Sequence, residues 1–421
     1  MKTIELTKQE FDKFAINNPN RSFYQTSAYG DLMSNHGFSS IYVGLIDDAN
    51  TLYAASLILY KNIFLHYKFA YAPRGFLIDF NNYDLLKEFT QKIKKYLSYR
   101  NFVFIKIDPP IIYKTRKKDG SIDSFGINNQ VIIDRLQNMG YIHLGFNNNF
   151  EALKPRWNII TRVITSSNEL FNSFDKDLKT KIRSAEKKGI TIKKGNFDDI
   201  KDFYNFVKKK HHIRNLKYYE DFWKIFHEKD MFELWFAEID FNKYLKYAKD
   251  NYDKESNINE DINQELSKLK TNREPLINKK IHSDNLLNEY KKNVIYGIKM
   301  TNKYPTGKVI AGSAVIKYGN EIFFLIDGFD EEYNNLNPNH YLKWKTMEHY
   351  INEGYKTMHL NGISGNFEKE DNKYYGLYNF KKAFNGNIVE YIGEFDLLIK
   401  KQRYYFFKKV YEIMDRFKLN K

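Results

Sequence analysis

The chain has 421 residues, more than one hydrophobic core usually serves, so we expect two domains. It has no cysteine, which excludes disulfides, cysteine-ligated zinc, iron–sulfur clusters and thiol nucleophiles. The formal net charge of +15 indicates an anionic partner (nucleic acid, a phosphorylated substrate or the inner face of a membrane), although a lysine-rich surface without such a partner explains it equally well.

The first half of the chain alternates helical and extended patterns. Residues 1–8 lack an apolar signal core, and charged residues interrupt the apolar window 52–72, so we expect a cytoplasmic protein without a membrane span. Helices are expected over residues 6–16, 27–36, 83–100 and 129–139. Strands are expected over residues 41–46, 52–60, 69–79, 102–107 and 141–146, the third of them broken by Pro73, Arg74 and Gly75.

The second half repeats that order. Strands are expected over residues 309–317, 321–327 and 357–362, with a helix over residues 340–354. The interval from Gly75 to Asp108 equals the interval from Gly328 to Asn361, which suggests two copies of one α/β unit. We place the junction between them at residues 150–165.

Residues 240–294 differ in composition from the rest. Glycine is absent from residues 240–293, and apolar residues recur there at helical spacings on both sides of Pro275. This pattern predicts two antiparallel helices whose narrow apolar stripes pack on each other. The arm could contact a long partner such as tRNA, and a spacer or a dimer contact explains it equally well.

Several familiar catalytic motifs are missing. No histidine spacing fits a zinc site, and no Walker or Gly-x-Gly-x-x-Gly motif occurs. The run from Gly362 through Ser364 to Gly365 departs from the nucleophile elbow, so we interpret it as a turn whose backbone amides line a pocket. Asp108 ends a buried strand, where a carboxylate can act as a base, although a turn-forming aspartate before proline explains it equally well.

Three cations are candidates for binding an anion. Lys381 and Lys382 stand between Phe380 and Phe384, before a turn and a predicted strand over residues 388–395, so they could bind an anion or a developing oxyanion at the strand's mouth. The alternative is two solvated lysines on a hairpin loop. Arg214 lies among aromatic residues and could bind a phosphate through two hydrogen bonds.

Together these residues resemble those of the Fem family (FemABX) of peptidoglycan bridge-forming aminoacyltransferases, the FemA type most closely. The resemblance runs essentially from end to end. It rests on short motifs in a specific order: Phe23-Tyr24-Gln25-Thr26, Arg74-Gly75, Ile107-Asp108-Pro109, Lys187-Lys188-Gly189, Asn361-Gly362-Ile363-Ser364-Gly365, and Phe380-Lys381-Lys382 followed by residues 388–395.

The resemblance implies an α/β fold with two tandem GNAT-like (acetyltransferase-like) domains. The first would span residues 1–155, and the second would span 156–239 and 295–398. The arm at 240–294 would be an antiparallel coiled coil inserted in the second domain. Residues 399–421 would form a helix that packs back on the first domain.

The implied reaction is transfer of glycine, alanine or serine from aminoacyl-tRNA to the stem-peptide amine of a lipid-linked or UDP-linked peptidoglycan precursor. It needs no cofactor and no metal, and it would take place in the cytoplasm or at the inner membrane face. An aminoacyl ester is already activated, so the enzyme must align the amine, relay its proton and stabilise the oxyanion.

The resemblance also implies roles for individual residues. Lys381 would be the cation near the reacting carbonyl, Arg214 would bind the precursor's phosphate, and Asp108 would handle a proton or orient the acceptor peptide. The remaining expected substrate-binding residues are Arg74, Gly75, Asn361, Gly362, Ser364, Gly365 and Phe380.

One position departs from the family pattern. Relatives often carry a phosphate-binding lysine where this chain has Met33, and Arg74 would replace it only if its loop approaches. Two other functions remain open: an acyl-CoA-dependent N-acyltransferase, although no matching pyrophosphate loop is present, and a non-catalytic module that binds tRNA or the wall precursor.

Overall fold

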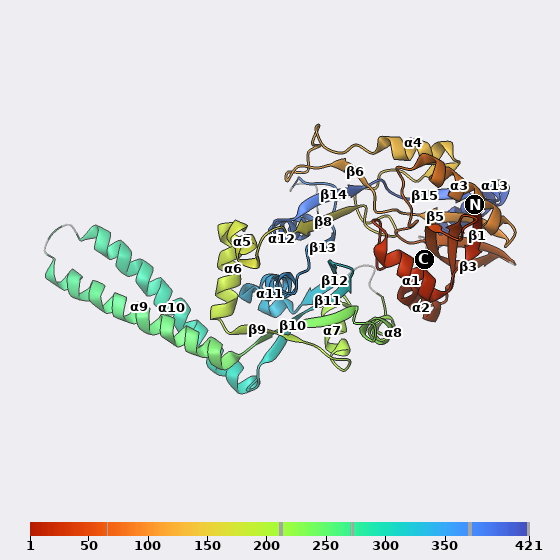
Figure 1. Cartoon of the computed structure of the whole chain (residues 1–421). Helices are drawn as coiled ribbons and strands as arrows, with labels where there is room; N and C mark the ends of the chain where they lie inside the picture. The colour runs from red at the N-terminus through yellow and green to blue at the C-terminus, as the bar shows by residue number, and fades with distance from the viewer. Residues whose placement is uncertain (65, 210–213, 270, 272, 369–372, 419–421) are drawn as a thin grey trace.

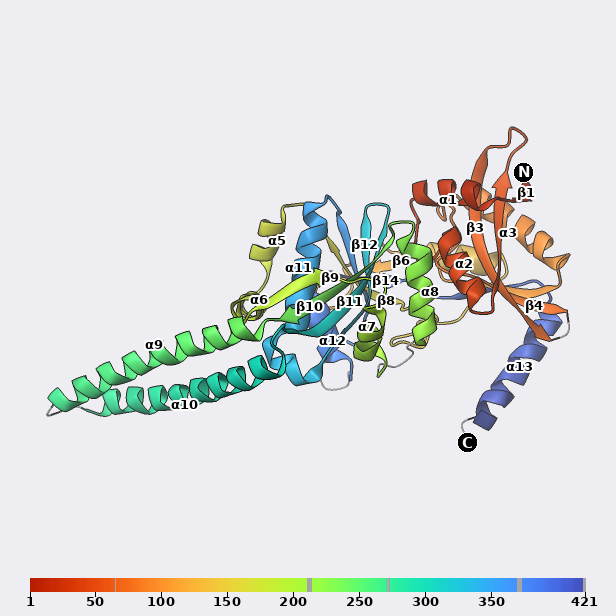
Figure 2. The same cartoon turned by 90° about the horizontal axis from the view of Figure 1, so that it is seen from below.

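The protein folds around two β-sheets that lie side by side, and a long helical hairpin projects from the second (Figures 1 and 2). The computed structural model describes residues 1–64, 66–209, 214–269, 271, 273–368 and 373–418. In that part of the chain, no helix combines the length and the apolar composition needed to cross a membrane.

The first sheet has seven strands. Their order is β1 (Lys2–Glu5), β2 (Ser39–Ile46), β3 (Leu52–Phe64), β4 (Tyr67–Ala72), β5 (Phe102–Ile107), β15 (Phe395–Leu398) and β7 (Tyr141–His143). Strands β4 and β5 are parallel and are joined by α3 (Tyr83–Ser98), whereas the other neighbours pair antiparallel. The remaining helices of this unit are α1 (Lys8–Asn17), α2 (Ser27–Asn35) and α4 (Gln130–Asn138).

Local sequence signals explain where these helices begin and which face they bury. Thr7 and Glu10 form a capping box at the start of α1. The hydroxyl of Thr26 caps α2. Helix α3 buries one apolar stripe at helical spacing, made of Leu86, Phe89, Ile93 and Leu97.

The second sheet has eight strands. Their order is β6 (Ile112–Thr115), β14 (Asn387–Tyr391), β8 (Trp157–Arg162), β13 (Thr357–Gly362), β12 (Glu321–Phe329), β11 (Lys308–Tyr318), β10 (Phe232–Ile239) and β9 (Ile190–Lys194). Strands β12 and β13 are parallel and joined by α11 (Pro338–Asn352). The other helices of this unit are α5 (Ser167–Ser173), α6 (Lys176–Lys187), α7 (Ile200–Val207), α8 (Leu216–His227), α12 (Tyr375–Lys382) and the 3-10 helix η1 (Glu331–Leu336).

When the first sheet is read from β1 and the second from β9, the strand orders correspond over seven positions, and β6 is an additional strand of the second sheet. In each sheet an antiparallel series leads into a parallel pair, β4 and β5 in one and β12 and β13 in the other. A strand from a distant part of the chain follows the parallel pair, β15 in the first sheet and β8 in the second. This correspondence agrees with the predicted repeat of one α/β unit.

The chain exchanges strands between the sheets, across the predicted domain boundaries. Strand β6 lies within the predicted first domain but pairs with β14 in the second sheet, while β15 lies within the predicted second domain but pairs with β5 in the first. The run 388–395, predicted as one strand, is divided between β14 and β15 at Gly393. This residue has a φ of +96°, which interrupts an extended strand and redirects the chain.

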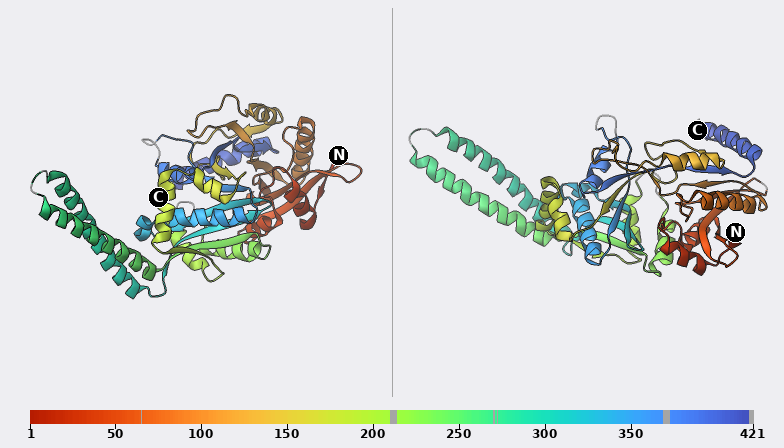
Figure 3. Two further views of the ribbon diagram at one scale, coloured as in Figure 1. Left: turned by 60° about the vertical axis from the view of Figure 1, so that its left-hand side comes forward. Right: turned by 45° about the horizontal axis from the view of Figure 1, so that its top comes forward.

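The arm consists of α9 (Phe241–Lys268) and α10 (Glu274–Lys303), which lie antiparallel (Figure 3). Pro275 lies in the first turn of α10, where a backbone N–H has no hydrogen-bond partner within the helix, so proline removes no helical hydrogen bond. The buried Asn259 side chain donates to Ser283 Oγ at 3.0 Å and to Asp284 Oδ1 at 2.9 Å, which favours one alignment of the two helices. Helix α10 continues beyond the predicted end of the arm at residue 294.

The last helix, α13 (Lys401–Lys418), begins directly after β15. The Tyr404 hydroxyl donates to Asp396 Oδ2 at 2.8 Å, and Tyr404 and Phe407 join a small buried cluster with Val103 of β5. The start of α13 therefore packs on the first sheet.

We expect Phe395→Ala to loosen the first sheet, because this fully buried ring belongs to its core. The cost should be about 3–5 kcal/mol of unfolding free energy. Amide hydrogen exchange should accelerate in β5 and β7, with Phe125→Ala, at a fully exposed ring, as the control. Faster exchange in β13 and β8 instead would contradict the placement of β15.

Candidate active site

Two adjoining cavities lie where the sheets meet. One, of about 70 Å³, is lined by Arg74, Asn361 and Lys154, and the other, of about 180 Å³, is lined by Arg214 and Lys154. They share the lining residues Phe23, Tyr24, Lys154 and Leu325. The fold thus brings three of the predicted substrate-binding residues to one place, around a lysine that the sequence analysis did not select.

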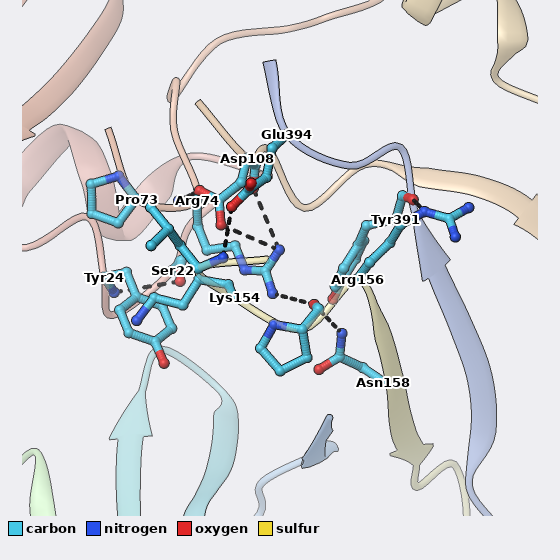
Figure 4. Close-up of polar contacts among 12 residues, drawn as sticks. Ser22, Tyr24, Pro73, Arg74, Asp108, Lys154, Arg156, Asn158, Tyr391 and Glu394 are labelled. Atoms are coloured by element: carbon cyan, nitrogen blue, oxygen red, sulfur yellow. Dashed lines mark hydrogen bonds and ion pairs between the residues drawn. The ribbon is translucent and has the colours of Figure 1, made fainter. Parts of the chain in front are cut away.

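Arg74 and Asp108 meet because they follow the adjacent parallel strands β4 and β5. The Arg74 backbone N–H donates to Asp108 Oδ1 at 2.6 Å, and the guanidinium lies 3.7 Å from Oδ2 (Figure 4). Arg74 Nη2 also donates to the Pro155 carbonyl at 2.8 Å, and the guanidinium lies 4.8 Å from the centre of the Tyr391 ring. These contacts hold the arginine at the cavity wall.

Asp108 itself lies behind this arginine. It is 2% exposed and is absent from the lining of both cavities. Burial raises the pKa of Asp108, while the charge and the backbone N–H of Arg74 oppose that rise. The carboxylate is placed to orient Arg74 and not to contact a ligand in either cavity.

Lys154 enters the site from the segment that connects the two sheets. The N–H of the preceding residue, Leu153, donates to Glu394 Oε1 at 2.8 Å, which fixes the backbone there. Lys154 Nζ lies 3.7 Å from the centre of the Tyr24 ring and 3.5 Å from the Tyr29 hydroxyl. Its contacts are thus an aromatic face and a phenol.

The surroundings of Lys154 make its ammonium easy to deprotonate. The pKa of Lys154 is lowered to about 7, chiefly by burial; Asp108 opposes this shift, and the positive charges of Arg74 and Arg214 contribute to it. The side chain keeps partial solvent exposure, so a ligand can reach the ammonium. An anion bound beside it would stabilise the charged form.

Arg214 stands before α8, whose first turn is capped by the Asn215 side chain. Its guanidinium is exposed and lies 5.4 Å from the centre of the Tyr218 ring. His212 and Ile213, which precede it in the sequence, lie outside the described residues. Arg214 is therefore a cation at the open side of the second cavity.

Lys381 lies on α12, so its predicted place on a hairpin loop or at a strand mouth is wrong. The side chain is buried, and Nζ donates to the Gly362 carbonyl at 2.7 Å. The neighbouring Asn361 has a φ of +70°, and its Nδ2 donates to the Leu325 carbonyl at 2.9 Å. Lys381 thus holds the backbone one residue behind the cavity wall.

The turn after Asn361 is packed tightly against the connecting segment. A Cβ atom on Gly362 would come within 2.5 Å of Pro155, and one on Gly365 within 2.3 Å of Trp157. The Ser364 hydroxyl donates to Asn149 Oδ1 at 2.8 Å. Glycine is needed here because the connecting segment fills the space of a side chain.

The sequence predicted that the backbone amides of this turn line a pocket, and for Gly362 and Gly365 this is wrong. The Gly362 N–H donates to Asn361 Oδ1 at 2.8 Å, and the Gly365 N–H donates to the Asn148 carbonyl at 2.6 Å. These donors hold the protein together and are not directed to a ligand.

Two predicted residues lie away from the paired cavities. Phe380 lines a separate cavity of about 680 Å³ together with Lys382 and His340, so Phe380 and Lys381 contact different surroundings. A Cβ atom on Gly75 would lie 3.0 Å from Nε2 of the buried Gln25, which indicates a packing role for this glycine.

Lys154 and Tyr24 line both cavities, although no pattern in the sequence indicated them as site residues. Lys154 falls within the junction expected at residues 150–165, and a cation in a segment that crosses between two domains is a signal that could have indicated it. Met33, where relatives were expected to carry lysine, is 4% exposed and packs in the core. The cation beside α2 comes instead from Lys154, which contacts Tyr29 of that helix.

Comparisons with known proteins cover nearly the whole chain. The lipid II:glycine glycyltransferase of Staphylococcus haemolyticus (strain JCSC1435) is 25% identical over 97% of this chain and 96% of its own. The aminoacyltransferase FemA of Staphylococcus aureus (strain MRSA252) is 25% identical over 99% of this chain and 100% of its own.

Solved structures show a similar fold. The crystal structure of FemX superposes with a TM-score of 0.75 at 22% sequence identity, covering 96% of this chain and 99% of its own. A family model described as the FemAB family matches residues 6–412. The chain therefore belongs to the FemAB family.

Proposed function

We propose that this protein is an aminoacyltransferase that moves glycine, alanine or serine from aminoacyl-tRNA to the stem-peptide amine of a peptidoglycan precursor. The observation that carries the proposal is the meeting of Arg74, Lys154 and Arg214 at paired cavities beside the turn that Lys381 holds. Relatives that match over their full length are named for aminoacyl transfer, one of them to lipid II.

We further propose that each sheet with its helices is a GNAT-like domain and that α9 and α10 form a coiled-coil arm. The matching strand orders and the antiparallel helices support this reading. The paired cavities then lie between two domains, a common place for a binding site.

In the proposed reaction, the acceptor amine attacks the ester carbonyl of the aminoacyl-tRNA. A C–N bond forms, the ester C–O bond breaks, and the amine's proton passes to the ribose oxygen that leaves. The ester is already activated, so positioning and charge stabilisation suffice for a large acceleration.

Lys154 and Arg214 are proposed to bind the precursor's phosphate groups. They line one cavity from opposite elements, the connecting segment and the start of α8. Charged donors that converge from two sides bind phosphate strongly. Lys154 would supply the positive charge that relatives were expected to carry at the position of Met33.

Lys381 is proposed to act near the reacting carbonyl. It is a buried cation beside the cavity wall, and its bond to Gly362 fixes the adjacent Asn361. Asp108 is proposed as a positioning residue, because its carboxylate holds Arg74 and lies behind it. Arg74 and Asn361 would orient the acceptor in the first cavity.

The experiment that tests the function mixes the protein with a lysine-containing precursor and tRNA charged with glycine, alanine or serine. Mass added to the precursor with one charged tRNA is the expected result. Transfer from acyl-CoA instead, or tRNA binding without any transfer, would contradict the proposal.

Lys381→Ala should lower kcat by about a hundredfold to a thousandfold, because in the proposed role Nζ, which is bonded to the Gly362 carbonyl in the free protein, donates to the developing oxyanion. Lys382→Ala is the matched control, because the neighbouring lysine lines a different cavity. Equal losses in the two variants would contradict a specific role for Lys381.

Acceptor binding should weaken as the pH rises through about 7. The Lys154 ammonium is present below its pKa of about 7 and is lost above it, so the free protein must take up a proton to bind the anion at higher pH. In Lys154→Arg the charge persists at every pH used, so this pH dependence should disappear.

Calorimetric titration with precursor at pH 6 to 9, without tRNA, measures this dependence apart from ionisation of the attacking amine. The same loss of affinity in Lys154→Arg, or tighter binding at high pH, would show that Lys154 does not bind the anion.

A further inference from the structure

The first-sheet unit carries an apolar groove that the proposed reaction does not use. It has a volume of about 970 Å³ and lies between α1, the ends of β2 and β3, and the start of α3. Its apolar lining includes Ile4, Phe14, Leu52, Ile78, Leu85 and Ile111. This volume is at the upper end for ligand pockets.

Most of these side chains are only partly covered. Ile4, Phe14 and Leu52 pack at the edge of one hydrophobic cluster, while Leu85 and Ile111 pack at the edge of another. The groove is thus the seam between two clusters. Covering such surface with hydrocarbon is favourable by about 25 cal/mol per Å².

Several polar groups along the groove are already bonded to the protein. Asn20 Nδ2 donates to the Ile78 carbonyl at 2.7 Å, and the Tyr53 hydroxyl donates to Asp47 Oδ2 at 3.1 Å. Asp79 Oδ1 accepts the Asn81 N–H at 2.8 Å. Because these groups already have hydrogen-bond partners, a ligand in the groove does not have to supply them. A hydrocarbon chain therefore fits the groove better than a polar ligand.

The groove adjoins the cationic site along two chain segments. Residues 18–20 line the groove and residues 21–24 line the smaller of the paired cavities. Pro110 lines that cavity and the next residue, Ile111, lines the groove. A ligand that occupies both must have an anionic head and an apolar chain joined directly to it.

We propose that the groove binds the polyprenyl chain of a lipid-linked acceptor while the diphosphate lies at Lys154 and Arg214. This inference rests on the proposed function and selects the lipid-linked acceptor over the UDP-linked one. The groove would hold the isoprene units nearest the diphosphate, and the rest of the chain would stay in the membrane.

The first test compares two acceptors with the same stem-peptide headgroup, one that carries an undecaprenyl chain on its diphosphate and one that is linked to UDP and carries no apolar chain. Phe14→Ser and Ile111→Ser should each lower kcat/KM about tenfold more for the long-chain acceptor. Phe125→Ser, at a fully exposed ring elsewhere, is the matched control and should leave the ratio between acceptors unchanged. Equal losses with both acceptors, or a change of ratio in Phe125→Ser, would overturn the proposal.

The second test does not depend on transfer. Farnesyl diphosphate with a benzophenone at the end of its chain should cross-link to the groove, as mapped by mass spectrometry, and Phe14→Ser should reduce this labelling. Cross-links confined to other surfaces would overturn the proposal that the groove binds the polyprenyl chain. Groove labelling without transfer from any aminoacyl-tRNA would refute the proposed function and leave the lipid site standing.

Discussion

The two segments that cross between the sheets are bonded to each other, and the site depends on this constraint. Glu394, just before β15, accepts the N–H of Leu153, while Arg156 Nε donates to the Tyr391 carbonyl at 3.0 Å. Arg156 also forms a buried ion pair with Glu390. Removing one partner of a buried pair typically costs about 3–5 kcal/mol, so the connecting segment has one strongly preferred path. Lys154 is held between the sheets as a result.

The same constraint explains the chemistry of the paired cavities. The parallel strands β4 and β5 bring Arg74 and Asp108 together at their carboxyl ends, and the connecting segment closes over them through the Pro155 carbonyl. The cations therefore gather where water is partly excluded and where a phosphate would interact strongly. In the second unit, α12 supplies Lys381 to the turn that completes the wall.

Much of this arrangement could be predicted from the sequence, because local patterns carry it. The equal intervals from Gly75 to Asp108 and from Gly328 to Asn361 indicated a repeat, which the matching strand orders support. The exchange of β6 and β15 could not be predicted, since strand patterns say nothing about which sheet receives a strand. Lys154 was missed for a related reason: its neighbours Tyr24 and Asp108 are distant in the sequence, and only the fold brings them close.

The measurement that tests this account most directly is a crystal structure with the precursor bound. We expect phosphate oxygens within hydrogen-bonding distance of Lys154 Nζ and the Arg214 guanidinium, with the stem peptide directed to Asn361. A precursor bound in the separate cavity beside Lys382 and His340, with the paired cavities empty, would contradict the account.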